Sequence, residues 1–124
     1  KTKKIPGSRH YIHAIDVADG CFFLLNKKIK LKHDFGGAKC PKFNLVGPVE
    51  LNNLELAKII ANVVNKKLKY KMVDFHSSRP GHDLRYALDG GLMEKLGWIP
   101  KISIEERISQ VVKWTVKNHR WLVI

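Results

Sequence analysis

The sequence lacks several features that would each indicate a function. It has two cysteines, Cys21 and Cys40, and neither they nor His10 and His13 have the neighbours of a metal site, so we expect free thiols and no metal. No apolar run approaches the roughly 18 residues needed to span a membrane, and lysine-rich residues 1–4 are not followed by the apolar core of a signal peptide. We therefore expect a cytoplasmic protein without a membrane partner.

Acidic residues are also scarce. The chain has 11 Asp and Glu against 23 Lys and Arg, a formal net charge of +12, which suits an anionic ligand or nucleic acid. The lysines gather at 1–4, 27–42 and 66–71, with no aromatic stacking platform between them. This distribution makes a basic nucleic-acid-binding domain an alternative only.

A glycine-rich dinucleotide-binding turn is missing as well. The only adjacent glycine pairs, Gly36-Gly37 and Gly90-Gly91, lack the spacing and the strand-turn-helix context of that fingerprint. We therefore expect this chain by itself to bind no NAD.

Alternating residues predict strands near 10–15 and 69–75, and a short buried run ended by Gly47-Pro48 predicts another at 43–46. A further extended stretch is expected at 84–88. At 124 residues the chain suits one domain, so a single small α/β domain over 1–124 is expected.

Helices are expected after Ile15, Leu51, Leu88 and Ile102. Their N-caps are predicted to be short polar side chains, Asp16, Asn52, Asp89 and Ser103, of which Asn52 and Ser103 have the glutamate of a capping box three residues on. The second helix is expected to bury a stripe formed by Leu54, Ala57, Ile60, Ala61 and Val64. The last is expected to bury Ile104, Ile108, Val111, Val112 and Thr115.

The most informative stretch is the turn at 76–83. Pro80 presets the backbone angle of a tight turn, and Gly81 accepts the positive φ that follows. Arg79 is then held at a bend, where a planar guanidinium can bind a phosphate or carboxylate through two parallel hydrogen bonds. The turn predicts an anionic ligand, although the simpler interpretation is a polar surface turn between two strands.

The order of residues here resembles a known signature. Arg79-Pro80-Gly81-His82-Asp83, followed by Arg85-Tyr86-Ala87-Leu88-Asp89, is similar to the segment near the C-terminus of the nucleoside-diphosphate-glucose 4,6-dehydratases, which belong to the extended short-chain dehydrogenase/reductase family. Flanking segments around Arg9, Phe43 and Leu96-Gly97-Trp98 are also similar, so the resemblance covers most of residues 9–118.

The resemblance implies a set of substrate-binding residues: Arg9, Asn53, Ser78, Arg79, Pro80, Gly81 and His82. In the family the arginine matching Arg9 faces the substrate diphosphate, and the asparagine matching Asn53 contacts the nucleotide sugar. On chemistry alone, Arg9 is equally an exposed arginine at a strand end, and Asn53 a polar residue in the first turn of a helix. Ile15 departs from the family pattern, in which an acid is common.

The fold class implied is α/β: the C-terminal substrate-binding portion of an extended short-chain dehydrogenase/reductase, with one edge of the Rossmann sheet and without its nucleotide-binding half. Residues 9–47 would include segments that pack on the missing Rossmann domain. No tyrosine has a lysine four residues later, so the catalytic Tyr/Lys pair of the family is absent. We expect no catalytic residue in this chain, which alone would be inactive, and NAD as the cofactor of the full-length parent.

The implied substrate is a nucleotide sugar, dTDP-glucose or UDP-glucose. The parent would convert it to the 4-keto-6-deoxy sugar and water, as a homodimer formed through the missing half. Nucleotide-sugar 4-epimerases and UDP-glucuronate decarboxylases share the architecture and are the alternatives within the family.

Overall fold

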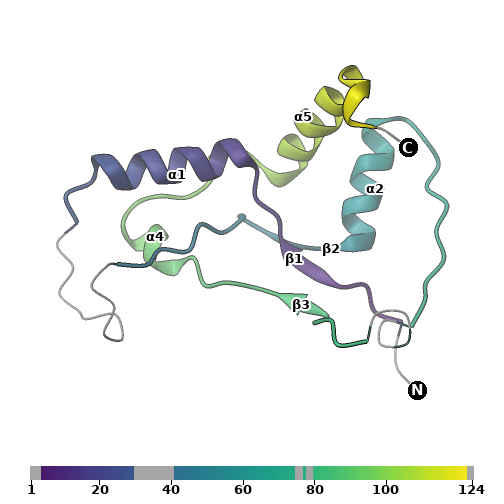
Figure 1. The fold of residues 1–124 in the computed structure, drawn as a ribbon, viewed down its shortest axis with the longest axis horizontal. Helices are drawn as coiled ribbons and strands as arrows, with labels where there is room; N and C mark the ends of the chain where they lie inside the picture. The colour runs from purple at the N-terminus through teal and green to yellow at the C-terminus, as the bar shows by residue number, and fades with distance from the viewer. Residues whose placement is uncertain (1–3, 30–40, 75–76, 78–79, 123–124) are drawn as a thin grey trace.

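The computed structural model describes residues 4–29, 41–74, 77 and 80–122 of the chain. In chain order the elements are β1 (Ser8–His10), α1 (Ala14–Asn26), β2 (Glu50–Asn52), α2 (Asn53–Val63), β3 (Arg85–Tyr86), α4 (Gly91–Lys95), α5 (Ile104–Lys117) and the 3-10 turn η1 (His119–Trp121) (Figure 1). The predicted α/β class is confirmed.

The strands form one small sheet in the order β2-β1-β3. Arg9 at the centre of β1 lies opposite Leu51 of antiparallel β2 and opposite Tyr86 of parallel β3. Because side chains alternate between the two faces of a strand, these three residues share one face. Ser8 and its partner Arg85 belong to the opposite face, as the polar contacts below show.

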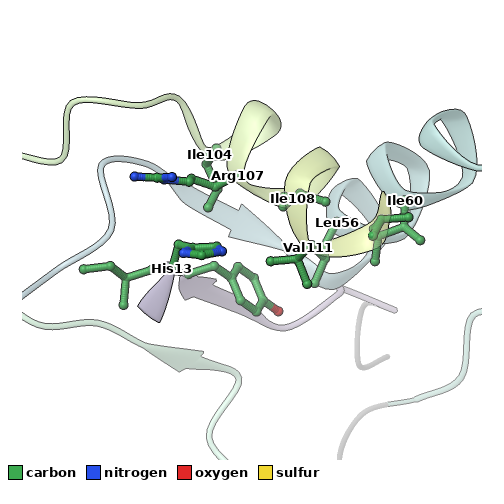
Figure 2. A pocket seen from close by; sticks show the side chains of 10 residues that line it. His13, Leu56, Ile60, Ile104, Arg107, Ile108 and Val111 are labelled. Carbon is green, nitrogen blue, oxygen red and sulfur yellow. The ribbon is translucent and has the colours of Figure 1, made fainter. Parts of the chain in front are cut away.

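The core lies between the sheet, α2 and α5. Leu51, Ile104 and Ile108 are buried there, and Tyr11, Leu56, Ile59 and Val112 pack against them. Beside this core the β1–α1 connection, α2 and α5 enclose a groove of about 160 Å³, whose walls include His13, Ile60 and Val111 (Figure 2). Leu51 thus joins the sheet to both helices.

The apolar stripe expected for α2 is partly wrong. Ala61 is buried as predicted, but Ile60 is 37% exposed, and Leu56 and Ile59 pack on the core instead. Apolar residues cover well over half of the circumference of α2, with Glu55, Lys58 and Asn62 on the remainder, so spacing alone could not decide which part of this wide apolar face meets α5. In α5, Ile104 and Ile108 are buried as expected, whereas Val111 is 45% exposed.

The strand predicted at 10–15 is wrong in extent. β1 ends at His10, and α1 already begins at Ala14. The cap of α1 is His13, whose Nδ1 accepts from the Ile15 N–H at 3.0 Å. The capping role predicted for Asp16 is therefore wrong, because this residue is buried and its carboxylate pairs with Arg107.

Two other predicted strands are not observed in the described part of the chain. Residues 43–46, and the described part of 69–75, form no ladder there, whereas the unpredicted β2 does. A sequence suited to a strand becomes one only where a partner backbone is available. The extended stretch at 84–88 is observed only as the two residues of β3.

The other predicted caps are confirmed more closely. Asn52 Oδ1 accepts from the Glu55 N–H, and Glu55 Oε2 accepts from the Asn52 N–H, both at 2.9 Å. Asp89 Oδ1 accepts from the first N–H of α4, at 2.8 Å, although Gly90 is the residue at the cap. Ser103 caps α5 by accepting from the Glu106 N–H at 3.2 Å. Local side-chain chemistry thus set the start of α2 and α5.

Candidate functional site

The structure describes five of the predicted site residues: Arg9, Asn53, Pro80, Gly81 and His82. Ser78 and Arg79 lie outside the described residues. Arg9 is on β1, Asn53 is the first residue of α2, and the other three form a turn that leads through Leu84 into β3.

Arg9 and Asn53 converge around Gly7. The Asn53 N–H donates to the Gly7 carbonyl oxygen at 2.9 Å. A Cβ added at Gly7 would lie 3.6 Å from Arg9 Nη1, 3.6 Å from Asn53 Nδ2 and 3.1 Å from the Leu84 carbonyl oxygen. Arg9 Nη1 and Asn53 Nδ2 are therefore no farther apart than the sum of these two 3.6 Å distances. Both groups thus lie within contact distance of position 7, which is buried.

The Arg9 side chain is held by the aromatic ring of Tyr86 and by the backbone carbonyl of Ser8. Its guanidinium lies 4.5 Å from the centroid of the Tyr86 ring, and its Nη1 donates to the Ser8 carbonyl oxygen at 2.8 Å. A guanidinium has five N–H groups. Contacts within the described residues occupy few of them, so Arg9 retains donors for an anion.

The amide of Asn53 has one defined orientation. Its Oδ1 accepts from the Tyr11 hydroxyl at 2.8 Å, which leaves the amide nitrogen on the side of Gly7. Tyr11 is a residue that the sequence analysis missed, although an aromatic residue two positions after Arg9 was a visible signal. The Tyr11 hydroxyl thereby fixes the orientation of the Asn53 amide, whose NH2 group can act as a donor.

The turn has the backbone that its sequence predicted. Gly81 has φ +77°, and a Cβ there would meet nothing within 4 Å, so the backbone angle is what favours glycine. Pro80 and His82 are exposed. Within the described part of the chain, no hydrogen bond or ion pair joins Pro80 or His82 to Arg9 or Asn53, but the Leu84 carbonyl accepts from the Ser8 N–H at 2.9 Å. This hydrogen bond holds the segment that follows the turn at the Ser8 end of β1, next to Gly7 (Figure 1).

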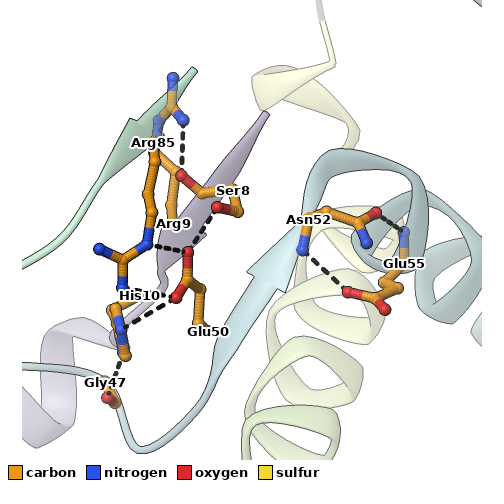
Figure 3. Close-up of polar contacts among 8 residues, drawn as sticks. All are labelled: Ser8, Arg9, His10, Gly47, Glu50, Asn52, Glu55 and Arg85. Carbon is orange, nitrogen blue, oxygen red and sulfur yellow. Dashed lines mark hydrogen bonds and ion pairs between the residues drawn. The ribbon is translucent and has the colours of Figure 1, made fainter. Parts of the chain in front are cut away.

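Glu50 joins all three strands on the opposite face of the sheet (Figure 3). Its carboxylate accepts from Arg85 Nε at 2.7 Å and Nη2 at 2.8 Å, and also from the Ser8 hydroxyl. His10 Nε2 lies 3.8 Å from the same carboxylate. Hydrogen bonds from Arg85, and then from Ser8, lower the pKa of Glu50 to about 2. The sequence analysis grouped Arg85 with the turn and missed its partner Glu50.

A second carboxylate–arginine pair, Asp16 with Arg107, is enclosed between α1 and α5. Arg107 Nε donates to Asp16 Oδ2 at 2.9 Å, and the side chains are only 13% and 7% exposed. The hydrogen bond to Asp16 raises the pKa of Arg107. The sequence analysis predicted neither role.

The apolar groove of Figure 2 is not suited to catalysis, because its polar side chains are already engaged. Each polar group on its wall has a structural partner: Tyr11 bonds to Asn53, His13 caps α1, and Arg107 pairs with Asp16. The candidate site is therefore the Gly7 end of β1.

In residues 4–29, 41–74, 77 and 80–122, no three His, Cys, Asp or Glu side chains are grouped to hold a metal. None of the helices in this part of the chain combines the length and apolar character needed to cross a membrane. Cys21 is free and exposed, and Cys40 lies outside the described residues.

Comparison with known proteins returns nucleotide-sugar enzymes. The chain is 31% identical over 110 residues to a protein named putative GDP-L-fucose synthase 2 from Arabidopsis thaliana, covering 89% of this chain and 30% of that protein. It is 30% identical over 89 residues to dTDP-glucose 4,6-dehydratase from Escherichia coli, covering 64% and 25%. The mouse dTDP-D-glucose 4,6-dehydratase is 29% identical over 118 residues, covering 91% and 31%. No protein-family profile matches the chain.

A solved structure agrees with these relatives. The crystal structure of dTDP-glucose 4,6-dehydratase from Bacillus anthracis, in complex with NAD, superposes with a TM-score of 0.69 at 25% identity, over 94% of this chain and 33% of that one. The chain thus spans about a quarter to a third of the length of the proteins it matches. The matches in sequence and in fold agree with the Arg79–Asp89 signature, and the chain belongs to the extended short-chain dehydrogenase/reductase family, as a C-terminal portion of such a protein.

Proposed function

We propose that this chain is the substrate-binding part of a nucleotide-sugar 4,6-dehydratase. The observation that carries the proposal is the convergence of Arg9 and Asn53 around Gly7, at the end of β1 where the turn at 80–83 arrives. A guanidinium and a directed amide donor suit the diphosphate and an adjoining hydroxyl of a nucleotide sugar. Relatives named dTDP-glucose 4,6-dehydratase support dTDP-glucose, with UDP-glucose as the alternative substrate.

The substrate-binding set is the one that the resemblance implied: Arg9, Asn53, Ser78, Arg79, Pro80, Gly81 and His82. Within it, Arg9 and Arg79 bind the diphosphate, and Asn53 donates to the sugar or to a phosphate oxygen. Arginine is suited to this role because its planar group can present two parallel N–H groups to one phosphate.

The parent protein would be a lyase that converts the nucleoside-diphosphate glucose to the 4-keto-6-deoxy sugar and water. The contribution of this portion is positioning, because holding the diphosphate fixes the sugar relative to the reacting groups. NAD would be the cofactor of the parent, but the residues present here do not fit it. The connection from β1 to α1 is Tyr11-Ile12-His13, which has no glycine to let a backbone approach a pyrophosphate.

One face of α1 is suited to the rest of such a protein. Ile15, Phe22 and Leu25 are 58%, 68% and 84% exposed, and they are spaced to form one stripe. In the proposal this stripe and residues 43–46 pack on the Rossmann domain of the parent, a cytoplasmic homodimer. Residues 1–124 are then one nucleotide-sugar-binding unit.

The direct test is calorimetric titration of the chain, and of the full-length parent, with dTDP-glucose, UDP-glucose and a GDP-sugar. Arg79→Ala should raise the dissociation constant for the preferred nucleotide sugar by roughly ten- to a hundred-fold, since a charge-assisted hydrogen bond contributes about 1.5–3 kcal/mol. Arg79→Lys should recover only part of the loss. Arg9→Ala should also weaken binding.

Lys58→Ala is the matched control, because Lys58 is exposed on α2. The chain alone should bind no NAD more tightly than roughly millimolar and should have no dehydratase activity. Equal losses for Lys58 and Arg79, with affinity falling steeply as salt rises, would contradict the proposal and favour nucleic-acid binding.

A further inference from the structure

We propose that Glu50 is a positioning residue for the diphosphate site: it clamps β3 to β1 through Arg85 and Ser8, and so places Arg9, the Tyr86 ring beneath it, and the turn at 80–83. The inference rests on the proposed function for the identity of the ligand. The placement itself can be measured without a ligand.

The clamp matters because β3 has little else to hold it. The strand is two residues long, Arg85 and Tyr86, and both are exposed. Strands in proteins usually run for about five or six residues, and a pair this short is held by few backbone hydrogen bonds. Glu50 adds two hydrogen bonds to β3 through Arg85 and one to β1 through Ser8.

The two neighbours of Arg85 in the chain, Leu84 and Tyr86, connect this clamp to the diphosphate site. Tyr86 follows Arg85, and its ring lies 4.5 Å from the Arg9 guanidinium. Leu84 precedes Arg85, and its carbonyl both accepts from the Ser8 N–H and closes the space beside Gly7. A shift of β3 along β1 would therefore displace the surface beneath Arg9, one wall of the site and the start of the turn together.

Glu50 is not itself suited to contact the substrate. It belongs to the face of the sheet opposite Arg9, and a carboxylate would repel a diphosphate. Both of its oxygens are engaged, with Arg85 and Ser8, and His10 lies beside one of them. Pairing with Glu50 also commits the Arg85 guanidinium, so Arg85 does not compete with Arg9 for the ligand.

The test compares Glu50→Gln, the reversed pair Glu50→Arg with Arg85→Glu, Arg9→Ala, and the double variant Glu50→Gln with Arg9→Ala, using dTDP as the probe. Glu50→Gln should raise the dTDP dissociation constant roughly three- to ten-fold, and the reversed pair should recover most of the affinity. The extra loss that Glu50→Gln causes in the Arg9→Ala background should be smaller than the loss it causes alone, because part of the effect of Glu50 acts through Arg9. Glu105→Gln, an exposed glutamate in the first turn of α5, should change nothing.

A second measurement needs no ligand. The NMR signal of the Arg9 side-chain Nε–H should shift in Glu50→Gln and return toward its original position in the reversed pair, while the signals of α5 stay in place. An unchanged Arg9 signal, or losses that add in the double variant, would overturn the positioning role. Absence of binding of both dTDP and UDP by the original chain, together with the expected Arg9 shift, would instead overturn the proposed function and leave the clamp established.

Discussion

Two arginine–carboxylate pairs in this chain have similar geometry but different surroundings. Arg107 with Asp16 is enclosed between α1 and α5, whereas Arg85 with Glu50 lies at the sheet, with 60% of the Arg85 side chain exposed. Loss of one partner in an enclosed pair leaves a charge away from water, whereas an exposed charge is solvated again. We expect the enclosed Asp16–Arg107 pair to contribute more to the stability of the fold, and the exposed Glu50–Arg85 pair to contribute mainly to the position of β3.

The largest effect should follow from breaking the enclosed pair. Arg107→Ala leaves the Asp16 carboxylate buried without its partner, so the midpoint of thermal unfolding should fall by roughly 5 °C or more. Circular dichroism during heating measures it. Lys113→Ala, an exposed residue on the same helix, is the control, and an equal fall for both variants would contradict the distinction.

Replacing both members of the enclosed pair should sharpen the comparison. Asp16→Leu with Arg107→Met removes both charges and keeps apolar volume between α1 and α5, so much of the stability lost in Arg107→Ala should return. Thermal unfolding of the double variant beside each single variant is the measurement. A double variant less stable than both singles would show that the hydrogen bonds themselves are essential.

A smaller effect, dependent on pH, is expected from the exposed pair. The pKa of Glu50 is about 2 in the folded chain against an ordinary value of 4.5, so its ionised pairing stabilises the fold above about pH 4.5 and is lost as the pH falls through 2. In Arg85→Leu the folded pKa should return toward 4.5.

The stability difference between the original chain and Arg85→Leu should therefore be largest near neutral pH and vanish at strongly acidic pH. Urea unfolding at a series of pH values measures this difference, and NMR titration of Glu50 measures its pKa directly. A constant difference across the whole range would assign the effect of Arg85 to packing.

The smallest effect on the fold should come from the site. Arg9→Ala removes a half-buried guanidinium from the Tyr86 ring and one hydrogen bond to a backbone carbonyl, a cost of about 1 kcal/mol or less. Denaturant unfolding should barely change, while nucleotide-sugar binding falls. A fall in stability as large as that of Arg107→Ala would make Arg9 a structural residue.

The helix caps show what was predictable from local sequence. Asn52 with Glu55, and Ser103 with Glu106, bond within one turn of chain, so neighbouring residues carry the information. Asp16 shows the opposite. A carboxylate before an apolar run predicted a cap, but its partner Arg107 lies 91 residues away, and the enclosed pair prevailed while His13 capped α1.

The sequence by itself determined the family resemblance, the backbone of the Pro80-Gly81 turn and the starts of α2 and α5, because each depends on residues close together in the chain. Only the tertiary structure decided that Arg9 and Asn53 both lie beside Gly7, that Arg85 is committed to Glu50, and which face of α2 is buried. These features depend on contacts between segments more than 30 residues apart, such as Arg85 with Glu50 at a separation of 35. A local sequence pattern carries no information about which distant segment will supply the partner in each of these contacts.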